Sequence, residues 1–308
     1  MADESIYMKK PWLKSYEKGV PETLNYEDIC MSEILDRTAK QFSERPALIF
    51  QGTTIKFREL KDMVDRFATC LNDFGVKKGD AVAILLPNII PCVAAYFAIL
   101  KIGALAVMNN PLYSDPELEH QFNDSGSKVL ITLDVLAPRM IALRPKTKIK
   151  QIVYTCIGDY LPALKRVLGR WLKKYPFADV PATADVYAWK DCLAKYPPNP
   201  PAVKNNFDDV AMYQYTGGTT GVSKGVMLTH ANLSKQVQQA CAWFPKFAKG
   251  EEIMLGALPY FHVFGLSVSM NFAIFMGWSQ VLIPRPQPEP LLEAIRNFRP
   301  TFAPLVPT

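Results

Sequence analysis

The sequence lacks paired cysteines. Its six cysteines are scattered, and none forms a Cys-x-x-Cys pair: Cys30, Cys70, Cys92, Cys156, Cys192 and Cys241. In a chain of 308 residues, this pattern is typical of reduced thiols in a cytosolic protein. It provides neither a disulfide framework nor the ligand spacing of a zinc site. We therefore predict a cytoplasmic protein.

Long apolar runs are also missing. The most apolar region, residues 81–108, is interrupted by Pro87, Pro91 and Lys101, whereas a membrane-spanning helix needs about 20 consecutive, predominantly apolar residues. Residues 1–16 are polar and charged and have no apolar core of a signal peptide. We therefore interpret residues 81–108 as buried core.

A strong excess of one charge is absent as well. The chain has 35 Lys and Arg residues against 29 Asp and Glu residues, which gives a net charge of +6. This modest charge gives a mild preference for anionic partners such as nucleotides, CoA or acidic lipid, and it predicts no nucleic-acid partner. With 49% hydrophobic and 21% charged residues, the composition is ordinary for an α/β globular protein of one large or two smaller domains.

The most informative feature is a stretch rich in glycine and threonine, residues 215–230, between apolar segments. Glycine lets backbone N–H groups approach an anion closely, and successive N–H groups form a concave anion site. Threonine hydroxyls add neutral donors, and Lys224 adds a positive charge suited to phosphate. A Walker A loop is excluded because Lys224 lies between Ser223 and Gly225, and the glycine spacing excludes a dinucleotide fingerprint. The stretch predicts a phosphate-binding loop of another kind, with an ordinary glycine-rich turn as the alternative.

This stretch resembles the phosphate-binding signature of the adenylate-forming enzymes, which include acyl-CoA synthetases, luciferase and peptide-synthetase adenylation domains. Their usual form is Tyr-Thr-Ser-Gly-Thr-Thr-Gly-x-Pro-Lys-Gly; here Gly217 replaces the serine and Ser223 the proline. The variant is similar to the bacterial long-chain fatty acyl-CoA synthetases, as are residues 109–113 and 117–126. The implied nucleotide-binding residues are Tyr215, Thr216, Gly217, Gly218, Thr219, Thr220, Gly221, Val222, Ser223, Lys224 and Gly225.

Strand and helix patterns alternate along the chain. We predict a β-hairpin at residues 47–50 and 54–57, and a βαβ unit of a parallel sheet at residues 81–86, 89–101 and 104–108. Similar units recur further along. The expected fold class is α/β, with stacked, mostly parallel, doubly wound sheets and flanking helices. The resemblance identifies it as the N-terminal domain of an adenylate-forming enzyme, truncated.

A proline-rich segment at residues 176–206 predicts a connector. It divides the chain into a first α/β subdomain, residues 1–205, and a second, residues 206–308, which carries the phosphate loop and is incomplete at its C-terminus. In the family, the acidic magnesium ligand, the ribose-binding Asp, the hinge and the C-terminal lid domain lie further along. We therefore interpret the chain as the N-terminal part of a synthetase, without the lid domain and without full activity on its own.

The resemblance implies a long-chain fatty acid–CoA ligase that uses ATP, Mg²⁺ and CoA. Its implied catalytic residues are Lys224, on the β- and γ-phosphates, and His262, beside the carboxylate in the similar stretch 254–265. Thr216 is implied to help position magnesium. By residue type alone, a histidine between aromatic residues such as His262 is more often a packed core residue. We interpret His120, on a predicted helix, as a surface or packing residue.

Three alternatives stay open. The first changes the acid or the acceptor: a medium-chain or aryl CoA ligase, or an acyl-AMP ligase that does not use CoA. The second is a non-catalytic module that binds a nucleotide or an acyl group. The third is a structural fragment without a ligand, which the intact phosphate loop disfavours.

Residues 160–175 form a separate pattern. Five basic residues and no acidic residue occur there: Lys165, Arg166, Arg170, Lys173 and Lys174. Apolar residues recur at helical spacing: Leu161, Leu164, Leu168, Trp171, Leu172 and Tyr175. A basic amphipathic helix with Trp can lie in a membrane interface, so the pattern suggests peripheral contact with the inner face of a membrane. The favoured alternative is a helix packed on the core with a solvated basic face. The oligomeric state is open, with a homodimer as one alternative.

Overall fold

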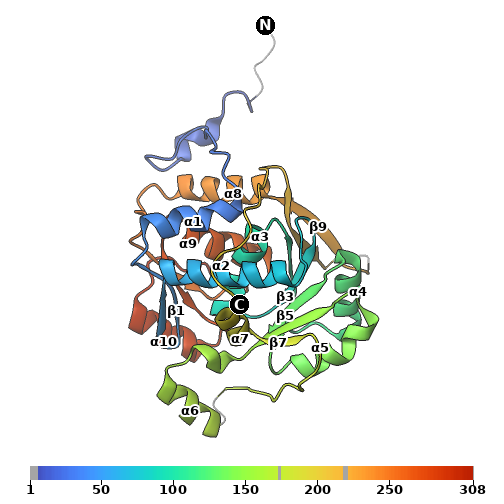
Figure 1. The fold of residues 1–308 in the computed structure, drawn as a ribbon. Coiled ribbons are helices and arrows are strands. Elements are labelled where there is room, and N and C mark those ends of the chain that lie inside the picture. Colours follow the sequence, from blue (N-terminus) through green and yellow to red (C-terminus); the bar gives the residue numbers. More distant parts are fainter. Residues whose placement is uncertain (1–5, 173–174, 218–220, 308) are drawn as a thin grey trace.

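Two sheets with helices between and around them make up the described part of the chain, residues 6–172, 175–217 and 221–307 of a computed structural model (Figure 1). Within these residues the larger sheet has seven strands in the order β7-β6-β5-β3-β4-β8-β9. Their bounds are β3 (Ala81–Leu85), β4 (Leu105–Met108), β5 (Val129–Leu133), β6 (Gln151–Thr155), β7 (Val186–Ala188), β8 (Val210–Thr216) and β9 (Lys224–Thr229). Neighbouring strands are parallel except β8 and β9, which are antiparallel.

The smaller sheet has the order β10-β11-β1-β2 among the described residues. Its strands are β1 (Pro46–Phe50), β2 (Thr53–Lys56), β10 (Ile253–Gly256) and β11 (Ser279–Leu282). The hairpin β1–β2 is antiparallel, whereas β1 pairs in parallel with β11, more than half the chain away. At the other edge, Phe302 bridges to Met254 of β10. The predicted α/β class with mostly parallel sheets is confirmed.

A layer of helices lies between the sheets. Helix α2 (Phe57–Asp73) packs on β1 and β2 and also on α3 (Ile90–Lys101), which in turn contacts β3 and β4. Every residue from Ile90 to Leu100 is buried, which confirms the interpretation of residues 81–108 as core. No helix within the described ranges is long and apolar enough to cross a membrane.

The other α-helices of the described residues are α1 (Met31–Gln41), α4 (Asp115–Ser125), α5 (Ala137–Leu143), α6 (Ala163–Trp171), α7 (Trp189–Lys195), α8 (His230–Trp243), α9 (Phe272–Met276) and α10 (Pro288–Phe298). Among them, α1 and α7 pack on α2, and α9 is buried throughout. Short 3-10 helices occur at Pro11–Ser15, Arg144–Lys146 and Ile157–Tyr160, and a π-helix at Gly265–Asn271 precedes α9.

The proline-rich segment 176–206, predicted as a connector, contains a strand and a helix. Strand β7 extends the large sheet, and α7 buries Trp189, whose indole N–H donates to the Tyr160 hydroxyl at 2.8 Å. Both sheets also take strands from each side of residue 205. The division into residues 1–205 and 206–308 therefore follows chain order and not the sheets, and it stays a prediction.

Candidate functional site

The predicted phosphate loop connects the antiparallel strands β8 and β9. In this hairpin Thr216 lies opposite Lys224, and Tyr215 lies opposite Gly225. The loop therefore follows the carboxyl end of β8, the edge at which parallel α/β sheets usually bind ligands. Gly218, Thr219 and Thr220 lie outside the described residues.

Tyr215 packs against the β8–β9 hairpin and ties it to α4. Its side chain is 6% exposed, and its hydroxyl donates to Asp124 Oδ2 at 2.6 Å. Burial, together with the Asp124 carboxylate, raises the pKa of the Tyr215 hydroxyl, which therefore stays protonated. A Cβ on Gly225 would lie 3.1 Å from the Tyr215 ring. The glycine thus lets the tyrosine pack directly under the β9 backbone.

Helix α4 holds the other end of the loop. His120 Nε2 lies 2.9 Å from the Ser223 carbonyl oxygen, and the Gln121 amide donates to Ser223 Oγ at 3.3 Å. His120 is a packing residue as predicted, but what it packs against is the loop itself. Sequence reasoning missed this role of His120 and Asp124, because nothing in the spacing of residues 115–125 indicates which element the helix will meet.

The loop residues that the structure describes face open space. Thr216, Gly217 and Lys224 are exposed, and a Cβ on Gly217 or Gly221 would meet no atom within 4 Å. Gly221 has φ of +110°, a conformation that residues other than glycine rarely adopt. A cavity of about 270 Å³ lies here, lined by residues of the loop, of α4 and of the turn before it: Tyr113, Pro116, Glu117, His120, Gln121, Gly217, Gly221, Val222 and Ser223. The cavity thus has backbone groups of the loop and the Glu117 carboxylate, which caps α4 through Ser114, in its lining, and the exposed Lys224 ammonium lies at the end of the same loop.

A second predicted site residue, His262, lies on a turn that is tied to the same strand. The Gln214 amide, two residues before Thr216, donates to the Phe261 carbonyl at 3.1 Å. The buried Asn88 side chain donates to the carbonyls of Gly256 and Leu258 at 2.9 and 2.8 Å, and it accepts from the Tyr260 N–H. His262 itself is exposed, so the core position that residue type alone favours is wrong.

Comparison with known proteins decides the family. Residues 35–308 match the family described as AMP-binding enzyme. The chain belongs to this family. The resemblance carried by the glycine-rich stretch is thereby confirmed, and so is the expected fold.

Curated relatives of this AMP-binding enzyme chain include bacterial long-chain-fatty-acid–CoA ligases. The Bacillus subtilis protein of that name is 35% identical over 303 residues, which cover 97% of this chain and 54% of the relative. The protein of the same name from Escherichia coli O157:H7 is 34% identical over 295 residues, covering 92% and 52%. The chain thus spans about half the length of the curated relatives that it matches.

Solved structures give the same fold. A long-chain-fatty-acid-CoA ligase, FadD1, from Archaeoglobus fulgidus superposes with a TM-score of 0.76 at 26% identity, covering 94% of this chain and 53% of that one. The anthranilate CoA ligase AuaEII in complex with anthranoyl-AMP superposes with a TM-score of 0.75 at 23% identity, covering 89% and 49%. At that identity the second likeness concerns the fold alone.

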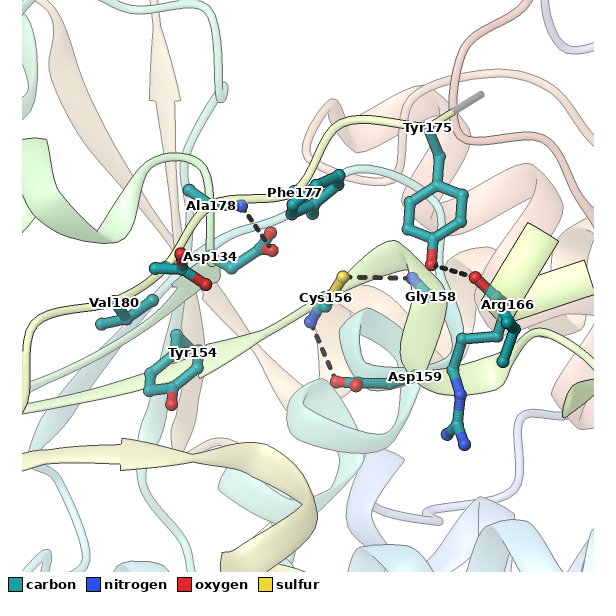
Figure 2. A pocket seen from close by; sticks show the side chains of 12 residues that line it. Asp134, Tyr154, Cys156, Gly158, Asp159, Arg166, Tyr175, Phe177, Ala178 and Val180 are labelled. Atoms are coloured by element: carbon teal, nitrogen blue, oxygen red, sulfur yellow. Dashed lines mark hydrogen bonds between the residues drawn. The ribbon is translucent and has the colours of Figure 1, made fainter. Parts of the chain in front are cut away.

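A larger cavity of about 500 Å³ lies elsewhere in this AMP-binding enzyme chain (Figure 2). Asp134 and Asp159 line it at the ends of β5 and β6, and both accept backbone N–H bonds. Burial raises the pKa of Asp134 and raises that of the Cys156 thiol to about 12, so this cysteine is protonated and unreactive at neutral pH. Arg166 also lines this cavity, and none of its described lining residues belongs to the glycine-rich stretch 215–230. The exposed β8–β9 loop remains the candidate site.

Proposed function

We propose that the complete protein carrying this chain is a long-chain fatty acid–CoA ligase. Support comes from the AMP-binding family and from relatives of that name at 34–35% identity. The observation that carries the proposal is the β8–β9 hairpin, whose exposed glycine-rich loop ends at the exposed Lys224 opposite Thr216.

The reaction has two steps. An oxygen of the fatty carboxylate attacks the α-phosphorus of ATP; an O–P bond forms to give acyl-AMP, and the bond to pyrophosphate breaks. The CoA thiolate then attacks the acyl carbon and AMP leaves, which gives the thioester. Catalysis of the first step consists mainly of positioning and of stabilising charge on the phosphates.

The residues of this chain supply part of that machinery. Lys224 and the N–H groups of the loop would bind the β- and γ-phosphates and stabilise the charge that develops on pyrophosphate. Tyr215 and His120 would keep the loop in place through the contacts to Asp124 and Ser223. The exposed His262 would border the carboxylate, because its turn is tied to β8 through Gln214.

Magnesium would have one ligand here. Residues 215–230 contain no acidic residue, and carboxylates are the groups that Mg²⁺ prefers besides phosphate oxygens and water. The neutral Thr216 hydroxyl fits a supporting contact, and ATP together with the acidic ligand that the family carries further along would supply the other oxygen ligands. When bound, it would neutralise part of the phosphate charge.

The test is AMP release from ATP by the complete protein. Lys224→Ala should lower this rate by about 10²–10³-fold, the usual loss when one charge-stabilising donor is removed. Lys146→Ala, which removes an equally exposed lysine outside the hairpin, is the matched control and should leave the rate unchanged. Wild-type turnover in Lys224→Ala would overturn the role of this lysine.

Substrate choice separates the remaining alternatives. A panel of long-chain, medium-chain and aryl acids distinguishes the acyl group. AMP that accumulates only when CoA is present indicates a CoA ligase, whereas stable acyl-AMP without onward transfer indicates an acyl-AMP ligase. Nucleotide binding without AMP release from any acid would favour a non-catalytic module and overturn the proposed function.

A further inference from the structure

Helix α6 presents its apolar stripe to solvent. Its apolar side chains recur at positions i, i+3, i+4, i+7 and i+8, which places them on one side of a helix. Their exposed fractions are high: Leu164 72%, Val167 65%, Leu168 45%, Trp171 79% and Leu172 49%. Of the apolar residues in the predicted pattern, Leu161 is buried in the core and Tyr175 packs against it, so the predicted alternative, a helix packed on the core, holds for these two and is wrong for the stripe.

The opposite side of α6 is fixed to the protein. The Tyr175 ring lies against two glycines, since a Cβ on Gly158 or Gly169 would come within 2.7 Å of it. The Tyr175 hydroxyl donates to the Arg166 carbonyl at 2.9 Å, as Figure 2 shows. These contacts involve Gly169 and the Arg166 carbonyl, on the side of α6 opposite the stripe. The apolar side chains of the stripe therefore point away from the protein.

A basic residue borders the stripe. Lys165, beside Leu168 and Leu172 on the helix surface, is exposed, and residues 160–175 carry five basic residues without an acidic one. Arg166 lies on the opposite side of α6, where it lines the cavity of Figure 2. Trp171, the most exposed apolar residue of the stripe, is of the type that concentrates at membrane–water interfaces. An apolar face bordered by cations complements the surface of an anionic bilayer, because acyl chains accept the apolar side chains and headgroups pair with the cations.

Helix α6 lies near the β1–β2 hairpin of the small sheet. Lys165 Nζ donates to the Gln51 carbonyl at 3.3 Å, in the turn between β1 and β2. Phe302, near the last described residue, bridges to β10 at the opposite edge of that sheet. Figure 1 shows α6 at the periphery of the fold. Phe302 thus lies at the edge of this sheet away from the β1–β2 hairpin.

We propose that α6 is an interfacial helix that binds the protein to an anionic lipid surface, with its axis along the membrane and its apolar stripe among the acyl chains. The occupant of the stripe is lipid. A second copy of the chain, or a later part of the complete protein, is the competing occupant. The proposal does not depend on ligase activity.

Vesicle flotation of the complete protein tests this proposal. The protein should float with vesicles of phosphatidylglycerol and phosphatidylcholine and remain unbound with phosphatidylcholine alone, and added salt should weaken binding. Leu164→Ser should lower the affinity about tenfold, whereas Leu292→Ser, a change of the same kind on the exposed face of α10, should not.

Charge reversal is the second arm. Lys165→Glu should weaken binding by roughly fivefold or more, since each basic residue near the surface adds about fivefold. Lys146→Glu, at an exposed lysine away from α6, should change it little. Circular dichroism of each variant verifies folding, and Lys224→Ala protein should still float, which separates this proposal from the proposed function.

Three outcomes would overturn it. If neither Leu164→Ser nor the charge reversal weakens vesicle binding, the lipid contact lies elsewhere on the protein. Self-association that Leu164→Ser abolishes, without flotation, assigns the stripe to a second copy. No flotation together with protection of Trp171 from a collisional quencher in the complete protein assigns it to another part of that protein.

Discussion

Helices α2 and α6 have the same kind of sequence and opposite surroundings. In α2 the apolar residues at helical spacing are fully buried: Phe57, Leu60, Val64, Phe67 and Leu71. In α6 the corresponding stripe lies in water, and the side that meets the protein is the one with Gly169. Amphipathic spacing therefore specifies which residues share a face, but not what covers that face. In α2 the cover is a sheet and a neighbouring helix; in α6 we infer that it is lipid.

Truncation in α2 should give the largest effect on stability. Phe67 is fully buried, and its ring centroid lies 4.3 Å from that of Trp189. Phe67→Ala removes this packing and leaves a cavity, so the free energy of unfolding should fall by about 3–5 kcal/mol. Urea unfolding followed by circular dichroism measures the change. A loss below about 1 kcal/mol would mean that α2 is no better packed than α6.

A buried titratable group should give the next largest effect. His230, at the start of α8, is 1% exposed, and burial lowers its pKa to about 4 despite the nearby Asp209. Above pH 6.5 the imidazole is neutral in both states. As the pH falls from 6.5 towards 4, the unfolded chain binds the proton first, so stability decreases, by about 2 kcal/mol between pH 7 and pH 5.

The His230→Gln variant isolates this contribution. Between pH 7 and pH 5, its free energy of unfolding should fall by about 2 kcal/mol less than that of the wild type, as measured by urea unfolding at each pH. Variants of Lys165 on α6 keep the buried imidazole, so they should keep the wild-type pH dependence. Equal pH dependence in wild type and His230→Gln would show that the imidazole is hydrated.

The smallest effect should come from α6. Trp171 is 79% exposed, so Trp171→Ala should change the free energy of unfolding by less than about 0.5 kcal/mol. This is the counterpart of Phe67→Ala, because an aromatic side chain is removed from the apolar stripe of each helix. A loss above about 1.5 kcal/mol in the complete protein would mean that protein covers the stripe of α6.

Local patterns predicted much of the fold. The β1–β2 hairpin and the βαβ unit around α3 are set by short-range spacing and turn chemistry. The glycine-rich loop is also recognisable in the sequence, because glycine, threonine and lysine in one short stretch are residue types suited to phosphate binding. The roles of Lys224, His262 and Thr216 stay predictions.

Long-range contacts escaped prediction. The segment 176–206 looks like a connector because of its prolines, yet Trp189 is buried within it. Asn88 and Asp124 resemble ordinary loop and helix residues until the fold brings Tyr260 and Tyr215 to them. Such contacts depend on which elements meet, and that information is spread over the whole chain.

The parallel pairing of β1 with β11 has a consequence for synthesis. Leu48 pairs with Gln280, so at about 5–20 residues per second the partner strand leaves the ribosome roughly 10–45 s after β1. During this interval one side of an apolar strand, Ala47–Phe50, has no hydrogen-bonding neighbour from β11. Unpaired apolar strand edges promote aggregation. The nascent chain therefore passes through a period in which a chaperone, or slow production at low temperature, should raise the yield of folded protein.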